Sequence, residues 1–373
     1  ADNCEVVDDN TIIIATHEPF SPLLGYLPYI GAVVVSEKEF TEDPEGAALN
    51  PVGTGPFKFV SWTKNDRCVY ERNEDYWGEK PAYKNLIIRT IVEANSRVIE
   101  LESGNIDIAL DIPANDVERL DSAEDTNVLK QASTVVEYLC MNVTKAPLDD
   151  VRVRQAIDWA LDEQAILDAV WRGNAQYSPT TVTPVMKYYD DSDTDCRYDP
   201  EKAKELLAEA GVSDLHFTLS IAENANRLNA ATIIQSMLAE VGITIEIQSY
   251  ESGTFYDMVD AGETEMIIVG FGAVGFPEPD NNIYGPFHSK QIPTNNMGFY
   301  SDPALDEMLD AQRTTDDGPE REEIIKNIQK YLRENLPVVP IANTQQVVGV
   351  RSDVQGFTPT PAASHFYDKV YFG

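Results

Sequence analysis

Hydrophobic residues recur with two different periods along the chain, and the period changes from one segment to the next. In residues 213–270 the apolar positions alternate, then recur at helical spacing, and then alternate again. Alternation is typical of strands and 3.6-residue spacing of helices. The pattern predicts strands at 215–221, 243–247 and 266–270, with helices at 228–240 and 254–261 between them. This βαβαβ order indicates a largely parallel sheet covered by helices.

The rest of the chain adds strands and helices of the same kinds. Residues 5–62 are predicted to be β-rich, because β-branched runs are separated there by turn residues. Further helices are expected to begin at residues that cap helices or fit their first turn, namely Asp149 or Asp150, Asp199 and Pro319. The fold class is therefore α/β, with strands expected at 12–16, 31–36, 86–91, 106–109 and 136–142 and a helix at 96–103.

Four segments carry motifs that occur in a consistent order. In the first, Gly53, Gly55 and Pro56 predict a tight turn, with glycine supplying positive φ. The segments are Asn50–Trp62 with Tyr70–Gly78, Ser96–Ala109, Asp150–Asp162, and Tyr198–Gly211. With these segments in this order, the chain resembles the large extracytoplasmic solute-binding proteins of the peptide/nickel ABC-importer family, and the resemblance extends from about Cys4 to the C-terminus.

The resemblance implies a two-lobed fold of the periplasmic-binding-protein type, class II-like, with hinge strands and a cleft between the lobes. Lobe I is expected over 1–142, lobe II, the main ligand-binding lobe, over 143–345, and a return to lobe I over 346–373. Residues 136–142 are expected to form one of the strands that cross between the lobes.

Family members usually begin with a targeting segment, a first strand of lobe I and a small extra domain. Here roughly a hundred or more residues of that pattern are expected to be absent, and Ala1–Cys4 lacks the basic start and apolar core of a signal peptide. A fragment, a compact variant and one piece of a split protein all remain open. Loss of that strand is expected to expose a sheet edge in lobe I.

The composition excludes several classes of protein. The formal net charge is −35, from 63 acidic and 28 basic side chains, so nucleic acid is not an expected partner, since phosphate binding requires clustered Lys and Arg. The acidic excess is typical either of high solubility or of a protein adapted to high salt, and we favour the second, halophile-like interpretation. No apolar run is long enough to span a bilayer.

The sequence contains no pattern of residues that predicts catalysis or metal binding. Four cysteines lack zinc-site spacing and leave both disulfides and free thiols open. Four histidines are scattered, and nucleophile-elbow, phosphate-loop and zinc-protease motifs are absent. We therefore expect a binding protein rather than an enzyme, with no cofactor and no metal.

The candidate binding site follows from the predicted sheet, because ligands of open α/β sheets bind beyond the carboxyl ends of the strands. Two loops, 222–227 and 271–287, are expected there. Their glycines and aromatic side chains suit a cleft that stacks on a ligand. The candidate ligand-binding residues are Asn142, Asn224, Arg227, Phe271, Gly272, Val274, Phe276 and Tyr284.

The expected function is that of the solute-binding component of an ABC importer. Outside the cytoplasm, such a protein binds a peptide-like solute and delivers it to permease subunits in the membrane. Peptide-binding members resembling this chain hold the α-ammonium group with an Asp, and the matching position here is Val274 or Gly275. Glu278 is one substitute. The alternatives are an oligosaccharide-binding member and a chemosensory receptor subunit. The expected location is the periplasm or the cell surface, and an anchor in a full-length precursor is left open.

Overall fold

The computed structural model describes residues 4–28, 33–272 and 277–373, and these divide into two compact units. Unit 1 contains residues 1–27 and 134–344, and unit 2 contains residues 28–133 and 345–373. Residues 1–27 and 134–142 therefore group with unit 1, whereas the sequence placed them in lobe I. Two long strands, β7 (Thr126–Met141) and β12 (Val338–Arg351), contribute residues to both units.

Unit 1 is built on a mixed sheet in the order β10–β9–β11–β7–β12, with the short β8 paired to β12. β9 is parallel to both β10 and β11, and β7 is antiparallel to β11. The predicted βαβαβ unit is confirmed. Its elements are β9 (Leu215–Ala222), α9 (Ala225–Glu240), β10 (Ile243–Tyr250), α10 (Ser252–Asp260) and β11 (Met266–Phe271).

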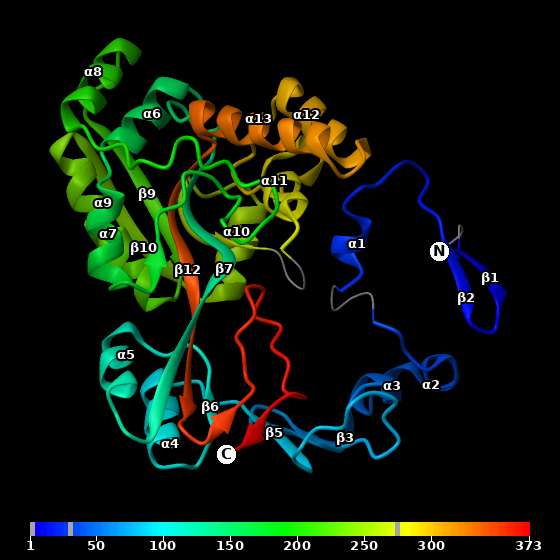
Figure 1. Ribbon diagram of the computed structural model, residues 1–373. Coiled ribbons are helices and arrows are strands. Elements are labelled where there is room, and N and C mark those ends of the chain that lie inside the picture. Colours follow the sequence, from blue (N-terminus) through cyan, green and yellow to red (C-terminus); the bar gives the residue numbers. More distant parts are fainter. Residues whose placement is uncertain (1–3, 29–32, 273–276) are drawn as a thin grey trace. The chain divides into compact units, whose positions relative to one another are not determined.

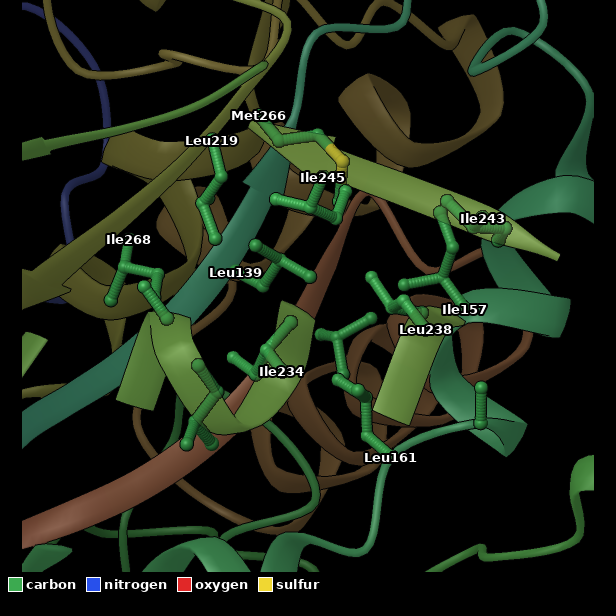
Figure 2. Packing of buried hydrophobic residues seen from close by; sticks show 14 of the residues in the cluster. Leu139, Ile157, Leu161, Leu219, Ile234, Leu238, Ile243, Ile245, Met266 and Ile268 are labelled. Atoms are coloured by element: carbon green, nitrogen blue, oxygen red, sulfur yellow. The ribbon is translucent and has the colours of Figure 1, made fainter. Parts of the chain in front are cut away.

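The central strands of unit 1 are buried on both faces. Alternate residues of β7 serve different cores: Leu139 and Met141 pack on one face, and Tyr138 and Cys140 on the other. Figure 2 shows the first core, in which Leu139 meets side chains from β9 to β11 and from the helices. Because these strands are buried on both faces, their sequences are nearly continuous runs of apolar residues.

Each face of the sheet has its own group of helices (Figure 1). The first group is α6 (Val151–Trp159), α7 (Glu163–Val170), α8 (Pro200–Ala210) and α9. The second is α10, α11 (Pro279–Phe287), α12 (Pro303–Thr314) and α13 (Pro319–Asn335). The remaining elements of unit 1 are β1 (Cys4–Asp8), β2 (Thr11–Ile14), α1 (Leu23–Tyr26), β8 (Ala175–Gln176) and η2 (Ser289–Gln291).

The residues predicted to begin and end α8 are found at its two ends in the structure. The Asp199 carboxylate accepts hydrogen bonds from the backbone N–H groups of Glu201 and Lys202. Pro200 occupies the first turn, where no hydrogen bond is lost, and Gly211 adopts the left-handed conformation with φ 74° after the last turn. The sequence therefore specifies both ends of this helix without help from tertiary packing.

Unit 2 contains smaller sheets and short helices. β3, β4 and β5 form a three-stranded antiparallel sheet, β6 pairs with the end of β12, and β13 pairs with β14. The elements are α2 (Glu37–Glu42), α3 (Pro44–Leu49), β3 (Phe57–Thr63), β4 (Arg67–Arg72), β5 (Asn85–Arg89), α4 (Ala94–Glu102), β6 (Ile108–Ala109), α5 (Ala114–Asp121), β13 (Val354–Gln355) and β14 (Tyr371–Phe372).

Two local expectations are wrong in the early part of the chain. Residues 33–36, the described part of the strand expected at 31–36, form no strand, and α1 to α3 interrupt the region expected to be β-rich. Gly53 and Gly55 are not among the glycines with positive φ, so the turn before β3 needs no left-handed residue. A β-branched run gives strand only where a neighbouring strand completes its hydrogen bonds.

Two buried acids lie among the helices on the first face. Asp158 of α6 and Glu163 of α7 are fully buried, and their carboxylate oxygens have no hydrogen-bond partner among the described residues. Burial raises the pKa of Glu163 to about 9 and that of Asp158 to about 6, with Arg333 opposing both shifts. Glu163 therefore keeps its proton at neutral pH in the folded protein.

This gives a stability prediction. Between about pH 5 and pH 9 the unfolded chain has released the Glu163 proton while the folded chain retains it. As the pH rises through this range, the free energy of unfolding therefore falls by up to about 1.4 kcal/mol per pH unit. We expect Glu163→Gln to flatten this dependence in urea titrations across that range. The control is Glu320→Gln at an exposed position of α13. Equal slopes in the two variants would contradict the assignment.

Candidate functional site

The carboxyl ends of three parallel strands in unit 1 form one edge of the sheet. Tyr250, the last residue of β10, is the register partner of Ala222, the last residue of β9. β11, the neighbour of β9, runs the same way and ends at Phe271, which pairs with Val136 of β7. The loops after β9 and β11 therefore leave the sheet on the side where ligands bind in open α/β folds.

A charged pair lies at this edge. Arg227, in the first turn of α9, donates Nε to Glu137 Oε2 at 2.9 Å and a terminal nitrogen to Oε1 at 3.1 Å. The two side chains are 16% and 14% exposed. Burial disfavours the charged guanidinium, but Glu137 and Tyr256 raise the Arg227 pKa. The bidentate geometry and low exposure make this a strong, directional pair.

The backbone and sequence around the pair explain its position. Met141, Leu139 and Glu137 lie on one face of β7, so the apolar row ends in a charge beside the carboxyl end of β11. Asn224 caps α9 by accepting a hydrogen bond from the backbone N–H of Arg227 at 3.0 Å. Gly270 is the register partner of Glu137, and a side chain there would overlap the carboxylate. Asn224 and Gly270 therefore position the charged pair.

Gly272 is another point of close approach. A Cβ atom at this position would lie 2.8 Å from the Cα of Val135 and 2.9 Å from the carbonyl oxygen of Thr134. Both contacts are with backbone atoms, which cannot turn aside as a flexible side chain can. The residue that follows β11 is therefore required to be glycine by packing against β7.

Phe271 contacts the helix that follows its loop. Its ring packs beside Gly285 of α11, where an added Cβ would lie 3.1 Å from Phe271 Cζ. Tyr284 of the same helix is buried in the second core, and the Arg313 guanidinium lies over its ring. Asn282 ties α11 to β7 by donating to the carbonyl oxygen of Thr134 at 2.9 Å. Phe271 is thus half-buried and held on one side by α11.

The predicted site residues do not form a single cluster. Asn142 follows Met141, which pairs with Met266 at the amino end of β11, whereas Phe271 lies at the carboxyl end, about 17 Å along the strand. The Asn142 side chain donates to the Thr264 carbonyl oxygen at 3.0 Å and accepts from Thr144. Arg227, Asn224, Phe271 and Gly272 belong to the carboxyl edge. Val274 and Phe276 lie outside the described residues.

The sequence did not predict the buried ion pairs that Glu278 and Asp280 form next to the loop. Asp280, fully buried, accepts two hydrogen bonds from Arg313 at 2.8 Å and one from the Tyr26 hydroxyl at 2.7 Å. Glu278 pairs with the fully buried Arg321 at 2.5 Å. Burial raises the Glu278 pKa, although Arg321 opposes the shift. Glu278 is therefore already neutralised by a protein cation, which argues against its serving as the counter-charge of a ligand ammonium.

The described residues contain neither a metal-binding cluster nor a membrane-spanning helix. Across residues 4–28, 33–272 and 277–373, no cluster of three His, Cys, Asp or Glu side chains is arranged to hold a metal ion. In these ranges no helix combines the length and apolar character needed to cross a bilayer. All four cysteines are free thiols, and Cys140 is buried.

The two compact units and the mixed sheet are the architecture of periplasmic binding proteins. The chain superimposes with a TM-score of 0.88 on a periplasmic binding protein associated with an ABC transporter from Helicobacter pylori, solved with the peptide STSA. The two are 30% identical, and the match covers 99% of this chain and 73% of that chain. The predicted α/β fold of the periplasmic-binding type is confirmed.

The model of the bacterial extracellular solute-binding proteins, family 5 Middle, matches residues 1–294, and the chain belongs to this family. It is 31% identical to the dipeptide-binding protein of Escherichia coli, over 98% of this chain and 70% of the relative. It is 32% identical to di/tripeptide-binding protein 1 of Pseudomonas aeruginosa, over 87% of this chain and 61% of the relative. The predicted family and the extracytoplasmic location are confirmed.

The charged pair gives a testable coupling. Arg227→Ala leaves the Glu137 carboxylate in a poorly solvated position, so we expect a loss of about 3 kcal/mol in the free energy of unfolding. The double variant with Glu137→Gln is expected to be more stable than Arg227→Ala alone, because no unpaired charge remains. Urea denaturation of the two single variants and the double variant measures the coupling. Additive losses would show that the pair contributes no specific interaction.

The close approach at Gly272 gives a second test. Gly272→Ala forces β7 and the loop apart, and we expect a destabilisation of about 1–3 kcal/mol, as for other overpacked sites. Gly55→Ala is the matched control, because an added Cβ there meets nothing within 4 Å and its φ is not positive. If both variants melt at the same temperature, the packing of the loop against β7 is not as described.

Proposed function

We propose that this protein binds a short peptide and that the carboxyl edge of the unit 1 sheet supplies the main binding surface. The observation that carries the proposal is the likeness, at 30% identity and across 99% of this chain, to a structure solved with a bound peptide. The dipeptide and di/tripeptide specificities of the two curated relatives support the same ligand class.

The geometry of the edge suits a peptide backbone. Phe271 offers a half-buried aromatic ring, the partly exposed Gly272 follows it at the end of β11, and the Arg227–Glu137 pair places both signs of charge at the same edge. A zwitterionic or amide-rich ligand needs such paired donors and acceptors to replace its water. We assign Arg227, Phe271 and Gly272 to the site and Asn224 to the positioning of Arg227. Asn142 and Tyr284 are proposed as supports of the lobe, because their side chains are already bonded or buried.

The oligosaccharide alternative finds no support in the relatives compared above, which are named for peptides. The oligosaccharide alternative was based on the absence of the Asp that peptide-binding members carry in this loop. The matching positions, Val274 and Gly275, lie outside the described residues. A chemosensory role is likewise not favoured by these relatives. The proposal requires binding and release only, without covalent chemistry.

We also propose that the protein delivers its ligand to ABC permease subunits. The Helicobacter pylori protein that it resembles is described as associated with an ABC transporter, and extracellular location is part of the family description. The partner would recognise the ligand-bound form, since transport requires that the loaded protein be distinguished from the empty one.

Thermal shift in high and low KCl tests the ligand class. We expect di- to pentapeptides of alanine to raise the melting temperature, because a ligand that binds only the folded state adds RT ln(1 + [L]/Kd), about 2.7 kcal/mol at a hundredfold excess over Kd. Malto-, cello- and xylo-oligosaccharides are expected to produce no shift. N-acetylated peptides report whether the ammonium group is recognised. A shift with sugars alone would overturn the peptide assignment.

A pair of phenylalanine variants locates the site. Phe271→Ala is expected to reduce the peptide-induced shift, whereas Phe366→Ala, whose side chain is 69% exposed in unit 2, is expected to leave it unchanged. Each shift is measured against the ligand-free melting temperature of the same variant, so a loss of intrinsic stability does not mimic a loss of binding. Equal responses would place the peptide elsewhere.

A further inference from the structure

The Arg227–Glu137 pair has a third member, Tyr256 of α10, which the sequence did not single out as a site residue. α10 begins directly after β10, so Tyr256 lies at the same edge of the sheet as the pair. The Tyr256 side chain is a further hydrogen-bond partner of the Arg227 guanidinium. Three elements of unit 1, namely β7, α9 and α10, therefore each supply one polar side chain to this edge.

The directions of these hydrogen bonds leave some capacity unused. A guanidinium only donates, so the Tyr256 oxygen accepts from Arg227 and the hydroxyl hydrogen remains for another acceptor. The Glu137 carboxylate accepts two hydrogen bonds from Arg227, and its oxygens have lone pairs for more. Tyr256 is 39% exposed. This part of the edge thus offers an O–H donor and a carboxylate acceptor, and an amide requires both kinds of partner.

The pair leaves no unpaired cation for a ligand carboxylate. Arg227 is the sole Lys or Arg in 222–228, 250–258 and 271–288, the segments that follow the three parallel strands. Its two bonds to Glu137, at 2.9 and 3.1 Å, are bidentate. A ligand carboxylate that approached Arg227 would also meet the Glu137 carboxylate, a like charge that is only 14% exposed. The edge therefore disfavours the carboxyl end of a peptide.

A ligand ammonium group has to compete with Arg227 for Glu137. Displacing Arg227 would leave its guanidinium, which is 16% exposed, without its counter-charge. The buried acids next to the loop are already paired with arginines. Glu223 and Glu251 lie at the edge but are exposed, and exposed ion pairs contribute little to affinity. The edge therefore does not favour the amino end of a peptide either.

We propose that this edge binds an uncharged amide from the interior of a peptide, and that Tyr256 selects this group by donating to the amide carbonyl oxygen. The amide N–H donates to Glu137, whose charge stays balanced by Arg227. Binding of an amide breaks no existing ion pair, whereas binding of either charged end would disturb one. This inference rests on the proposed peptide-binding function and extends it to peptides with blocked ends.

The ring of Tyr256 is held independently of its hydroxyl group. It packs edge-to-face with the ring of the fully buried Phe255, with the centroids 5.1 Å apart. Phe255 belongs to the second core of unit 1. Removal of the hydroxyl leaves this contact in place, so Tyr256→Phe changes the hydrogen bonding at the edge and preserves the packing behind it.

End-blocked peptides separate recognition of an amide from recognition of the charged ends. The probes are trialanine and the same peptide acetylated at its amino end and amidated at its carboxyl end, titrated by calorimetry at neutral pH. We expect the two dissociation constants to agree within about threefold. A larger loss on blocking shows that a charged end is recognised, which overturns this inference while peptide binding stands. If neither peptide binds, both this inference and the proposed function are wrong.

Ester substitution tests the amide on the wild-type protein. In a set of end-blocked peptides, one amide at a time is replaced by an ester, so that an oxygen acceptor takes the place of the N–H donor. At the amide that Glu137 accepts, this oxygen faces a carboxylate, and we expect binding to be at least about tenfold weaker there. Unchanged binding at every position overturns the inference, and this result does not depend on the folding of a variant.

A tyrosine variant tests the hydroxyl donor. Tyr256→Phe is expected to bind both the free and the end-blocked peptide about fivefold more weakly, as for the loss of one hydrogen bond. The matched control is Tyr198→Phe, because Tyr198 is also exposed in unit 1 but lies outside the segments that follow the three strands. It is expected to bind like the wild type. Unchanged binding by Tyr256→Phe, or a loss confined to the free peptide, overturns the role of Tyr256.

Discussion

The burial of the central strands of unit 1 on both faces is the constraint that decides where chemistry can occur in this protein. Leu139 and Met141 are buried on one face of β7, and Tyr138 and Cys140 are buried on the other. An unpaired charge in the middle of these strands would carry a large desolvation cost. Polar groups are therefore found where the strands end, and Glu137 is such a case, since it is charged, lies at the carboxyl edge of β11 and is paired with Arg227.

The same constraint explains the ionic network on the other side of the loop. Asp280 is fully buried and is neutralised by Arg313, with Tyr26 as a further donor. The bond from Tyr26 holds residues near the start of the chain to α11 and α12, which explains why residues 1–27 group with unit 1. A buried charge with several partners fixes its elements in one arrangement. α11 in turn supports Phe271 at the candidate site.

Sequence patterns predicted the parts of the fold that are specified locally. Alternation identified β9, β10 and β11, and capping residues identified α8, because each depends on neighbours a few residues away. Contacts between residues that lie far apart in the sequence could not be predicted from such local patterns. Arg227 was predicted as a ligand-binding residue, but its pairing with Glu137, ninety positions earlier, was not predicted. Asn142 was predicted in the same site, but the strand register, which places it beside the amino end of β11, could not be predicted from the sequence.

The two units differ in how completely they satisfy their own backbone. In unit 1 the strands that carry the candidate site are paired with neighbours and covered on both faces, so their backbone hydrogen bonds are satisfied within the sheet. In unit 2 the outer edges of β5 and β6 lack neighbours among the described strands, and Ile87 and Ile88 remain exposed. The residues proposed for ligand recognition in unit 1 are therefore separate from the open strand edges of unit 2, and the two can be changed independently by substitution.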